Sequence, residues 1–136
     1  MARIVTWLFV ESEQLSIEEL TEIIGITSDC SWRRGDSRGK AGKFHETSRW
    51  KVGSRVEVDD DMDAVLSQVN DSLRNILDRV RGHEAALSSL ALREHAGVFI
   101  GITVPFIPSL EFRGEVLKRM GAMDLDLEID LVVPGS

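Results

Sequence analysis

The sequence is poor in the residues that build cross-links and metal centres. Cys30 is the single cysteine among 136 residues, so no disulfide can form within the chain and the common cysteine-based zinc sites are excluded. The three histidines are scattered at His45, His83 and His95. His45-Glu46 is not a zinc-protease motif, because position 49 is an arginine. We therefore predict no metal, and a reducing compartment, the cytoplasm, is the expected location.

Long hydrophobic runs are missing as well. No apolar stretch approaches the roughly 18 residues that a membrane-spanning helix needs, and the N-terminus lacks the layout of a signal peptide. Repeats, linkers and low-complexity tracts are also absent. With 43% hydrophobic and 29% charged residues, the composition is typical of a globular protein. We expect one domain over residues 1–136, with no membrane partner.

The glycine-rich stretch 35–44 does not meet the phosphate-loop motif. For Gly42 and Lys43 to close that motif, position 37 should be glycine and position 44 should be serine or threonine, but these residues are Ser37 and Phe44. No buried strand directly precedes the stretch and no helix directly follows it. The sequence therefore predicts no nucleotide hydrolysis, no catalytic residue set and no cofactor.

What the chain does contain is a concentrated block of positive charge. Between Ser31 and Arg55 there are eight basic residues and two acidic ones, whereas the rest of the chain has eight basic and 21 acidic residues. This segregation indicates an anion-facing surface, or an internal partner for the acidic remainder. The net charge of −7 disfavours nucleic acid, which leaves single-stranded nucleic acid as a third and weaker alternative.

Hydrophobic periodicity predicts the element order β-α-loop-β-α-α-β-α-β. The expected strands cover 4–10, 48–56, 98–106 and 124–133, the expected helices cover 16–25, 59–81, 83–93 and 108–121, and an irregular loop covers 26–47. We predict an α+β fold with a single mixed or antiparallel sheet of four to five strands and helices packed on one face. A ferredoxin-like βαββαβ core with a C-terminal αβ unit results if the loop adds a short strand around Ser31 to Arg34.

Two of the expected strands carry charge on alternate residues, so their charged side chains share one face. On the last strand these are Asp124, Asp126, Glu128 and Asp130, and on the strand 48–56 they are Arg49, Lys51 and Arg55. Carboxylates along one strand do not converge as metal ligands do. If both strands belong to one sheet, their charged faces coincide, because both apolar faces seek the same core. We therefore predict that the basic set is structural and pairs with the carboxylates.

The long loop 26–47 is the expected binding region, since most connections in compact domains are shorter. The candidate site residues are Trp32, Arg33, Arg34, Gly35, Asp36, Arg38, Lys40, Lys43 and Trp50. We interpret the two tryptophans chiefly as anchors that hold the loop against the domain. Cys30 is expected to be a small buried side chain, with a thiol activated by the nearby arginines as the alternative.

The order of several short motifs resembles a known family. These motifs are a helix that ends at Gly25, the basic-glycine-acidic turn within 32–36, Trp50 at the start of the next strand, Gly121 at the end of a helix, and a final strand with Asp126 and Asp130. Their order is similar to that of the bacterial domain-of-unknown-function family numbered 4279. The resemblance covers nearly the whole chain and implies a small bacterial α+β domain without an established activity.

Two classes of function fit these features. The missing catalytic constellation and the exposed charges favour a non-enzymatic binding or protein-interaction module, for example of the immunity-protein type that masks another protein's site. The alternative is a small-molecule anion or phosphate site, with or without catalysis. It would use Arg33, Arg34 and Lys43 as anchors and His45 or Asp36 for proton transfer. Homodimerisation through an exposed sheet edge stays open.

Overall fold

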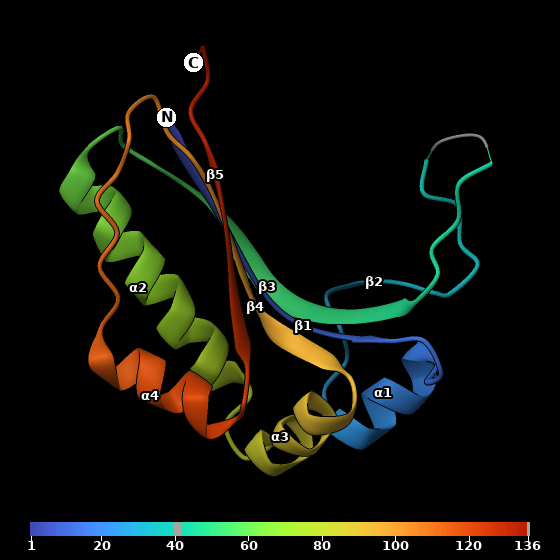
Figure 1. Ribbon diagram of the computed structural model, residues 1–136. Helices are drawn as coiled ribbons and strands as arrows, with labels where there is room; N and C mark the ends of the chain where they lie inside the picture. Colours follow the sequence, from blue (N-terminus) through green and yellow to red (C-terminus); the bar gives the residue numbers. More distant parts are fainter. Residues whose placement is uncertain (40–41, 136) are drawn as a thin grey trace.

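The computed structural model describes residues 1–39 and 42–135, and the order of its elements follows the predicted order with one short strand added. The described elements are β1 (Ala2–Ser12), α1 (Ile17–Ile24), β2 (Cys30–Trp32), β3 (Ser48–Val58), α2 (Met62–Arg79), α3 (Glu84–Arg93), β4 (His95–Thr103), α4 (Gly114–Ala122) and β5 (Asp126–Val132). Within the described residues, four helices cover one face of a single five-stranded sheet (Figure 1). The predicted α+β class is confirmed.

The strand order of the sheet is β2-β3-β1-β4-β5. The pairs β2–β3, β3–β1 and β1–β4 are antiparallel, and β4–β5 is parallel. β1 and β2 therefore run parallel with β3 between them, and β3 and β4 run parallel with β1 between them. These are two split βαβ units, the arrangement expected of a ferredoxin-like βαββαβ core. The segment α4–β5 then adds a fifth strand beside β4.

Local capping signals determine where two of the helices begin. The Ser16 hydroxyl accepts from the Glu19 backbone N–H at 3.1 Å, and the Glu19 carboxylate accepts from the Ser16 N–H at 3.1 Å, which completes the capping box before α1. α1 ends at Gly25, whose φ of 86° is a left-handed conformation that glycine adopts without strain. The Asp61 carboxylate accepts from the Ala64 N–H at 3.0 Å and caps α2.

The predicted starts of β4 and α4 were wrong. β4 begins at His95, three residues earlier than predicted, and α4 begins at Gly114 instead of position 108. The delay of α4 has a specific cause, because Asn70 of α2 hydrogen-bonds the backbone of the segment before it. The Asn70 side-chain amide donates to the Glu111 carbonyl at 2.9 Å, and its oxygen accepts from the Arg113 N–H at 3.0 Å. These backbone groups are then not available for an earlier helical turn.

The two faces of the sheet differ in cover. Alternate residues of β1, such as Ile4, Leu8 and Val10, are fully buried beneath the helices in one hydrophobic core. The other face carries no helix and is concave, because the sheet bends strongly along its strands (Figure 1). Gly53 of β3 allows a close approach at this bend, since a Cβ built there would lie 1.9 Å from the Thr6 carbonyl oxygen.

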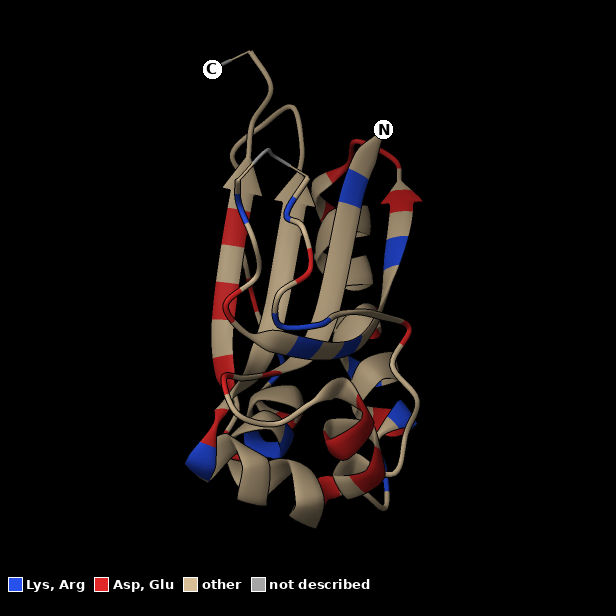
Figure 2. Cartoon of the chain, turned by 90° about the vertical axis from the view of Figure 1, so that its right-hand side faces the viewer, with Lys and Arg blue, Asp and Glu red and all other residues tan. Residues whose placement is uncertain are grey.

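The two charged ladders share the open face of the sheet, except for Asp124, which was predicted on the last strand but lies before β5, and they do not pair. Lys51 is opposite Phe9, Phe9 is opposite Gly97, and Gly97 is opposite Asp126, so all four positions lie on one face. However, β1 and β4 separate β3 from β5, so the predicted pairing of Arg49, Lys51 and Arg55 with the carboxylates was wrong. The acidic positions along β5 and the basic positions on β3 lie on different strands of the sheet (Figure 2).

The segment 26–47 was predicted to be an irregular loop, but parts of it are regular in the structure. It contains β2, and residues 33–39 and 42–47 run beside each other as two arms that project from the sheet (Figure 1), which we call the hairpin. Backbone hydrogen bonds hold its arms together: the Gly35 N–H donates to the His45 carbonyl at 2.8 Å, and the His45 N–H donates to the Asp36 carbonyl at 2.8 Å. An isolated bridge between Ser37 and Phe44 joins the arms further out. The predicted short strand near Ser31 to Arg34 exists, although it begins at Cys30.

Candidate functional site

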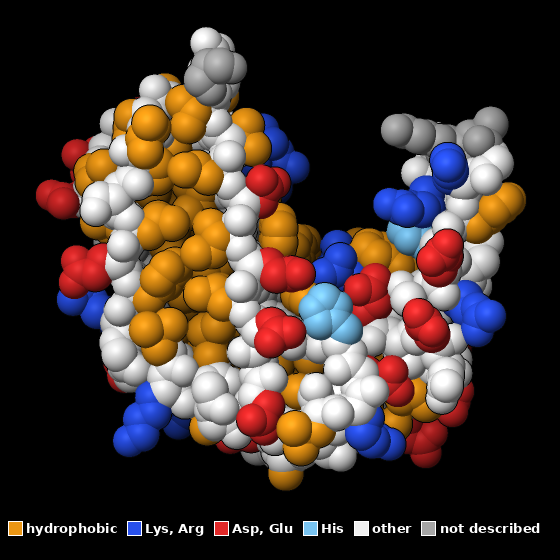
Figure 3. Space-filling model, viewed as in Figure 1, with side chains coloured by type: hydrophobic (Ala, Val, Ile, Leu, Met, Phe, Trp, Pro, Cys, Tyr) orange, Lys and Arg blue, Asp and Glu red, His pale blue; other side chains and the backbone are white. Residues whose placement is uncertain are grey.

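The open face of the sheet forms a cleft between two walls (Figure 3). One wall is β5 with its row of carboxylates, and the other is the hairpin of residues 33–39 and 42–47. We define the cleft floor as the open-face side chains that contact one another between these walls. They are Trp7, Phe9, Trp32, Arg49 and Lys51. The floor thus combines aromatic rings with two cations.

Arg49 covers the centre of the floor. Its guanidinium carbon lies 4.1 Å from the centroid of the Phe9 ring and 5.2 Å from that of Trp32. The ring of His95 approaches Phe9 from another side, with centroids 5.0 Å apart and nearly perpendicular planes. Phe9 is consequently 0% exposed, although no helix covers this face. The Arg49 Nε atom is buried and has no hydrogen-bond partner in the described part of the chain.

Lys51 lies beside Arg49 on the same strand face. Its ammonium nitrogen is 4.6 Å from the centroid of the Trp7 ring and 5.3 Å from that of Trp32. Burial lowers the pKa of Lys51 below its usual value of 10.5, nearby Cys30 opposes this effect, and the positive charge of Arg49 adds to it. Neither Arg49 nor Lys51 forms an ion pair within residues 1–39 and 42–135. The floor therefore holds two partly desolvated cations over aromatic rings.

Trp32 connects the floor to the hairpin. The His45 ring stacks on the Trp32 ring with centroids 4.2 Å apart and an interplanar angle of 13°. The Trp32 indole N–H is buried, and no described residue accepts a hydrogen bond from it. The predicted anchoring role of Trp32 fits this geometry, because the stack fixes the base of the hairpin against β2.

The β5 side of the cleft carries the opposite charge. His95 Nδ1 lies 3.5 Å from a Glu11 carboxylate oxygen, and His95 Nε2 lies 3.8 Å from Asp126 and 4.0 Å from Glu128. Glu11 also accepts from the Thr47 hydroxyl at 2.7 Å. These acidic groups surround one imidazole rather than one point in space, and the described residues contain no cluster that could hold a metal ion. The cleft is therefore electrostatically polarised from one wall to the other.

The structure divides the predicted loop residues into two groups. Arg33 forms an ion pair with Glu18 of α1, and the Arg34 guanidinium donates to the Glu13 carbonyl at 2.8 Å, so both side chains are turned toward the α1 side. Gly35 and Asp36 form the turn that follows, where the Asp36 carboxylate accepts from the Arg33 N–H at 2.8 Å. These interactions stabilise the base of the hairpin.

The second group of predicted residues belongs to the outer part of the hairpin. Arg38 and Lys43 are joined through the backbone, with the Arg38 N–H donating to the Lys43 carbonyl at 3.1 Å. Their side chains form no ion pair with another described residue. Lys40 lies outside the described residues. Basic side chains are visible on the hairpin opposite the acidic wall (Figure 3).

Two further predicted residues lie in unexpected surroundings. Trp50 is 0% exposed on the helix-covered face, and its indole N–H donates to the Ile26 carbonyl at 2.9 Å. This hydrogen bond anchors the segment after α1, but it keeps Trp50 away from the cleft. Cys30 is exposed on β2, so the expectation of a buried cysteine was wrong. Its position opposite Lys51 places it on the open face.

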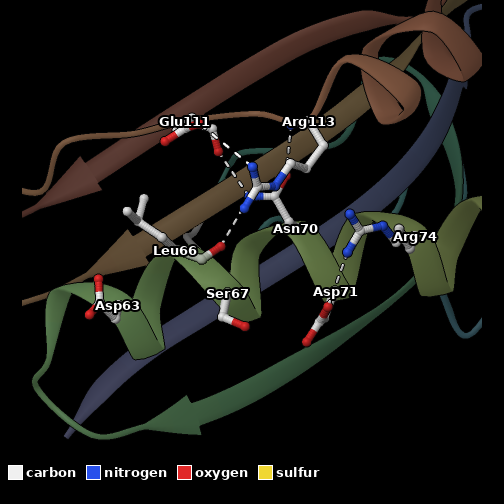
Figure 4. Close-up of a pocket in the computed structure, with 8 residues that line it drawn as sticks. All are labelled: Asp63, Leu66, Ser67, Asn70, Asp71, Arg74, Glu111 and Arg113. Carbon is white, nitrogen blue, oxygen red and sulfur yellow. Dashed lines mark hydrogen bonds and ion pairs between the residues drawn. The ribbon is translucent and has the colours of Figure 1, made fainter.

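A second concave region lies between α2 and the segment before α4 (Figure 4). Asn70 is central to it and donates to the Leu66 carbonyl at 3.0 Å besides its bonds to residues 111 and 113. Arg74 at its edge binds Asp71 at 3.3 Å and Glu115 at 2.7 Å. Because these central polar groups already have partners within the chain, the groove fits a structural role better than a ligand site.

Sequence reasoning missed the aromatic half of the floor. Trp7 and Phe9 lie within the run 4–10, which is apolar except for Thr6, so alternation could not reveal which residues face away from the helices. A partial signal was present in the residues themselves, because β1 places its two largest aromatic rings at positions of the same parity. Arg49 and Lys51 were predicted to be structural residues that pair with the carboxylates of β5, and they were not predicted as site residues.

The fold and the cleft together define the class of this protein. It is a small α+β domain of the split βαβ type with an added αβ unit, and one sheet face is left open. The chain belongs to the family described as domain of unknown function (DUF4279), which matches residues 2–134. The resemblance inferred from the sequence is thereby confirmed. No curated protein and no solved structure matches the chain. None of the described helices has the length and apolarity needed to cross a membrane.

Proposed function

We propose that this protein is a non-enzymatic binding module and that the cleft holds an acidic segment of a partner protein. The observation that carries this proposal is that Arg49 and Lys51 are partly buried cations without an ion-pair partner among the described residues. Both cations are held over aromatic rings, and neither forms an ion pair within the described residues. Folding therefore partly desolvates both charges in the free protein, and no carboxylate offsets the unfavourable desolvation free energy.

A partner carboxylate above the floor would supply that missing interaction. Charge-assisted hydrogen bonds to guanidinium and ammonium groups are about twice as strong as neutral ones. The rings of Trp7 and Trp32 would pack against apolar parts of the same segment. Such a carboxylate would also raise the pKa of Lys51, because it favours the charged amine.

The polarity of the cleft supports a preferred orientation of the segment. Arg38 and Lys43 add positive charge on the hairpin side, whereas Asp126, Glu128 and Asp130 line the opposite wall. Charge patterns of this kind exclude wrong partners and fix the docking register more than they add affinity. An acidic side chain is favoured near the hairpin and repelled near β5.

The alternative phosphate or anion site on the hairpin receives less support. It needs Arg33, Arg34 and Lys43 to converge on one pocket. Arg33 and Arg34 both line a shallow groove beside the start of α1, but Lys43 does not line it, and both guanidinium groups already have partners. The proposed proton-transfer groups are also engaged, since His45 stacks on Trp32 and Asp36 closes a turn.

The three tryptophans allow a direct test. An oligoglutamate peptide is titrated into the protein labelled with ¹⁵N, and the three indole N–H signals are followed. We expect the signals of Trp7 and Trp32 to shift, while that of buried Trp50 serves as an internal reference. An oligolysine peptide should leave the floor signals in place. The double variant Arg49→Gln, Lys51→Gln should lose the response.

Lys118, which is exposed on α4, provides a control for loss of one positive charge, to be compared with the single variants Arg49→Gln and Lys51→Gln. The variant Lys118→Gln should retain the affinity of the wild type within error. If the oligoglutamate peptide moves neither floor indole, or if the Lys118 variant weakens binding as much as the floor variant, the proposal is rejected. Titration with inorganic phosphate separates the alternative, which predicts changes at Arg33 and Arg34.

A further inference from the structure

The outer edge of β5 is unpaired in the described structure. β5 is the last strand in the sheet order and has β4 as its neighbour on one side. An edge strand presents backbone N–H and C=O groups in the geometry that another strand needs for pairing. β5 is seven residues long and regular over its whole length, so it offers an extended template.

The helix-side face of this edge is apolar and incompletely covered. Leu127, Ile129 and Leu131 remain between 36% and 43% exposed, although they alternate along the face that faces the core. Leu117 of the neighbouring helix α4 is 43% exposed. A continuous apolar strip runs beside β5 on the surface (Figure 3). The layer between sheet and helices is thus open at the β5 edge, and a strand added there would cover it.

The opposite face of the same edge is acidic, and this limits what can pair with it. Asp126, Glu128 and Asp130 alternate with the apolar residues. If a second copy paired in antiparallel register about Glu128, that residue would oppose its own equivalent and Asp126 would oppose Asp130. Like charges directly opposite each other destabilise a strand pair. A second copy of this chain is therefore a poor occupant of this edge.

We propose that β5 accepts an extended segment of another protein as a sixth strand, and that this segment alternates apolar and basic residues. Its apolar side chains lie over the uncovered strip, and its lysine or arginine side chains lie beside the three carboxylates. Backbone pairing provides affinity in such strand addition, and the alternate side chains provide specificity. This edge shares its three carboxylates with the acidic wall of the cleft but includes none of the floor residues, so the inference does not rest on the proposed function.

The test uses the full chain and synthetic peptides. The probe is a peptide of alternating lysine and valine that has the seven-residue length of β5. One control peptide alternates glutamate and valine, and another contains the lysines and valines in two blocks. Binding is measured by ¹H–¹⁵N chemical shifts and by hydrogen exchange. We expect the alternating lysine peptide to protect β5 amides from exchange, whereas both controls bind much more weakly.

Matched variants then test the charge argument. The triple variant Asp126→Asn, Glu128→Gln, Asp130→Asn should bind the lysine peptide about tenfold more weakly, since three cross-strand charge pairs are lost. The control variant Glu22→Gln, Asp59→Asn, Glu84→Gln removes the same charge from exposed positions elsewhere and should bind like the wild type. All residues involved are exposed, and circular dichroism verifies that both variants fold.

Several results would overturn the inference. Equal binding of the glutamate peptide or of the block peptide would show that alternating positive charge is not recognised. Shifts confined to the Trp7 and Trp32 indoles would place the peptide in the cleft instead. Concentration-dependent dimerisation that protects β5 without any peptide would identify a second copy as the occupant. An unchanged affinity in the triple variant would exclude the role of the carboxylates.

Discussion

The guanidinium carbon of Arg49 lies 4.1 Å from the centre of the Phe9 ring. Arg49 projects from β3 and Phe9 from the adjacent strand β1, both on the face that no helix covers. A phenylalanine on such a face would ordinarily be exposed to solvent, but Phe9 is fully buried. A charged side chain here performs the covering role that a helix performs on the other face.

This contact predicts a measurable cost for removing the guanidinium. Arg49→Gln should lower the free energy of unfolding by about 1–2 kcal/mol, because two cation–π contacts are lost and Phe9 becomes exposed. Urea denaturation at neutral pH provides the measurement. Arg55→Gln changes an exposed arginine on the same face of β3 and should cost much less. Equal losses in the two variants would contradict the covering role.

The lowered pKa of Lys51 predicts a stability effect at alkaline pH. Between the folded pKa and the unfolded value, the unfolded chain binds more protons, so stability should rise with pH in that window. Below the folded pKa the cost of burying the charge is present in full. NMR titration of the lysine side-chain signals should show Lys51 losing its proton below the usual lysine pKa of 10.5. The alkaline rise in stability should vanish in Lys51→Met and persist in Lys118→Met.

The ion pair between Asp29 and Arg79 predicts a dependence at acid pH. Hydrogen bonds from Arg79 lower the pKa of Asp29 below 3.8, and the Gly53 N–H donates to the same carboxylate at 3.0 Å. The stabilisation is therefore present above the unfolded pKa of Asp29 and is lost as pH falls through the folded one. Asp29→Asn should cost about 1 kcal/mol at pH 7, because the pair is partly exposed to solvent. Urea denaturation across pH should find this difference shrinking below about pH 3.8.

Asn70 predicts a large effect of a single polar side chain. Asn70→Ala leaves the Arg113 N–H and the Glu111 carbonyl without their partner and should destabilise the fold by about 2–3 kcal/mol. Hydrogen exchange should increase at residues 111–114. Asn75 on the same helix is exposed, and Asn75→Ala should change stability by less than about 0.5 kcal/mol. Similar effects of both changes would argue against a stabilising role of the Asn70 hydrogen bonds.

Two glycines with positive φ allow strain to be separated from crowding. Gly25 and Gly82 have φ values of 86° and 90°, so alanine should cost about 1 kcal/mol at either position. A Cβ at Gly25 would also lie 3.0 Å from His83 Nδ1, whereas a Cβ at Gly82 would meet nothing within 4 Å. Gly25→Ala should therefore be the more destabilising in thermal unfolding. The reverse order would show that His83 moves aside freely.

The sequence predicted those features that depend on neighbours along the chain. The capping box at Ser16, the end of α1 at Gly25 and the alternation along β5 are local, and each is present in the structure. The α+β class followed from the order of the elements. The order of the strands in the sheet could not be predicted in this way, because the apolar pattern of a strand does not specify which strand lies beside it. This is why the faces of β3 and β5 were predicted correctly while their pairing was not.

The candidate site was harder to predict for the same reason. Trp7 and Arg49 are distant in sequence, and only the pairing of β1 with β3 brings their strands together. The start of α4 depended on Asn70, which lies more than 40 residues earlier. Arg33 and Arg34 were predicted as binding residues, yet Arg33 is paired with Glu18 of α1 and Arg34 with the Glu13 carbonyl in the segment before α1.

The central position of β1 also has a consequence for the order in which the chain can fold. β1 precedes both of its neighbours along the chain: β3 ends at Val58, and β4 ends at Thr103. During synthesis β1 can therefore pair with β3 first, and its other edge stays unpaired until β4 has followed. Early helices α1 and α2 shield one side of that strand, so the aromatic side is the part that a chaperone would meet.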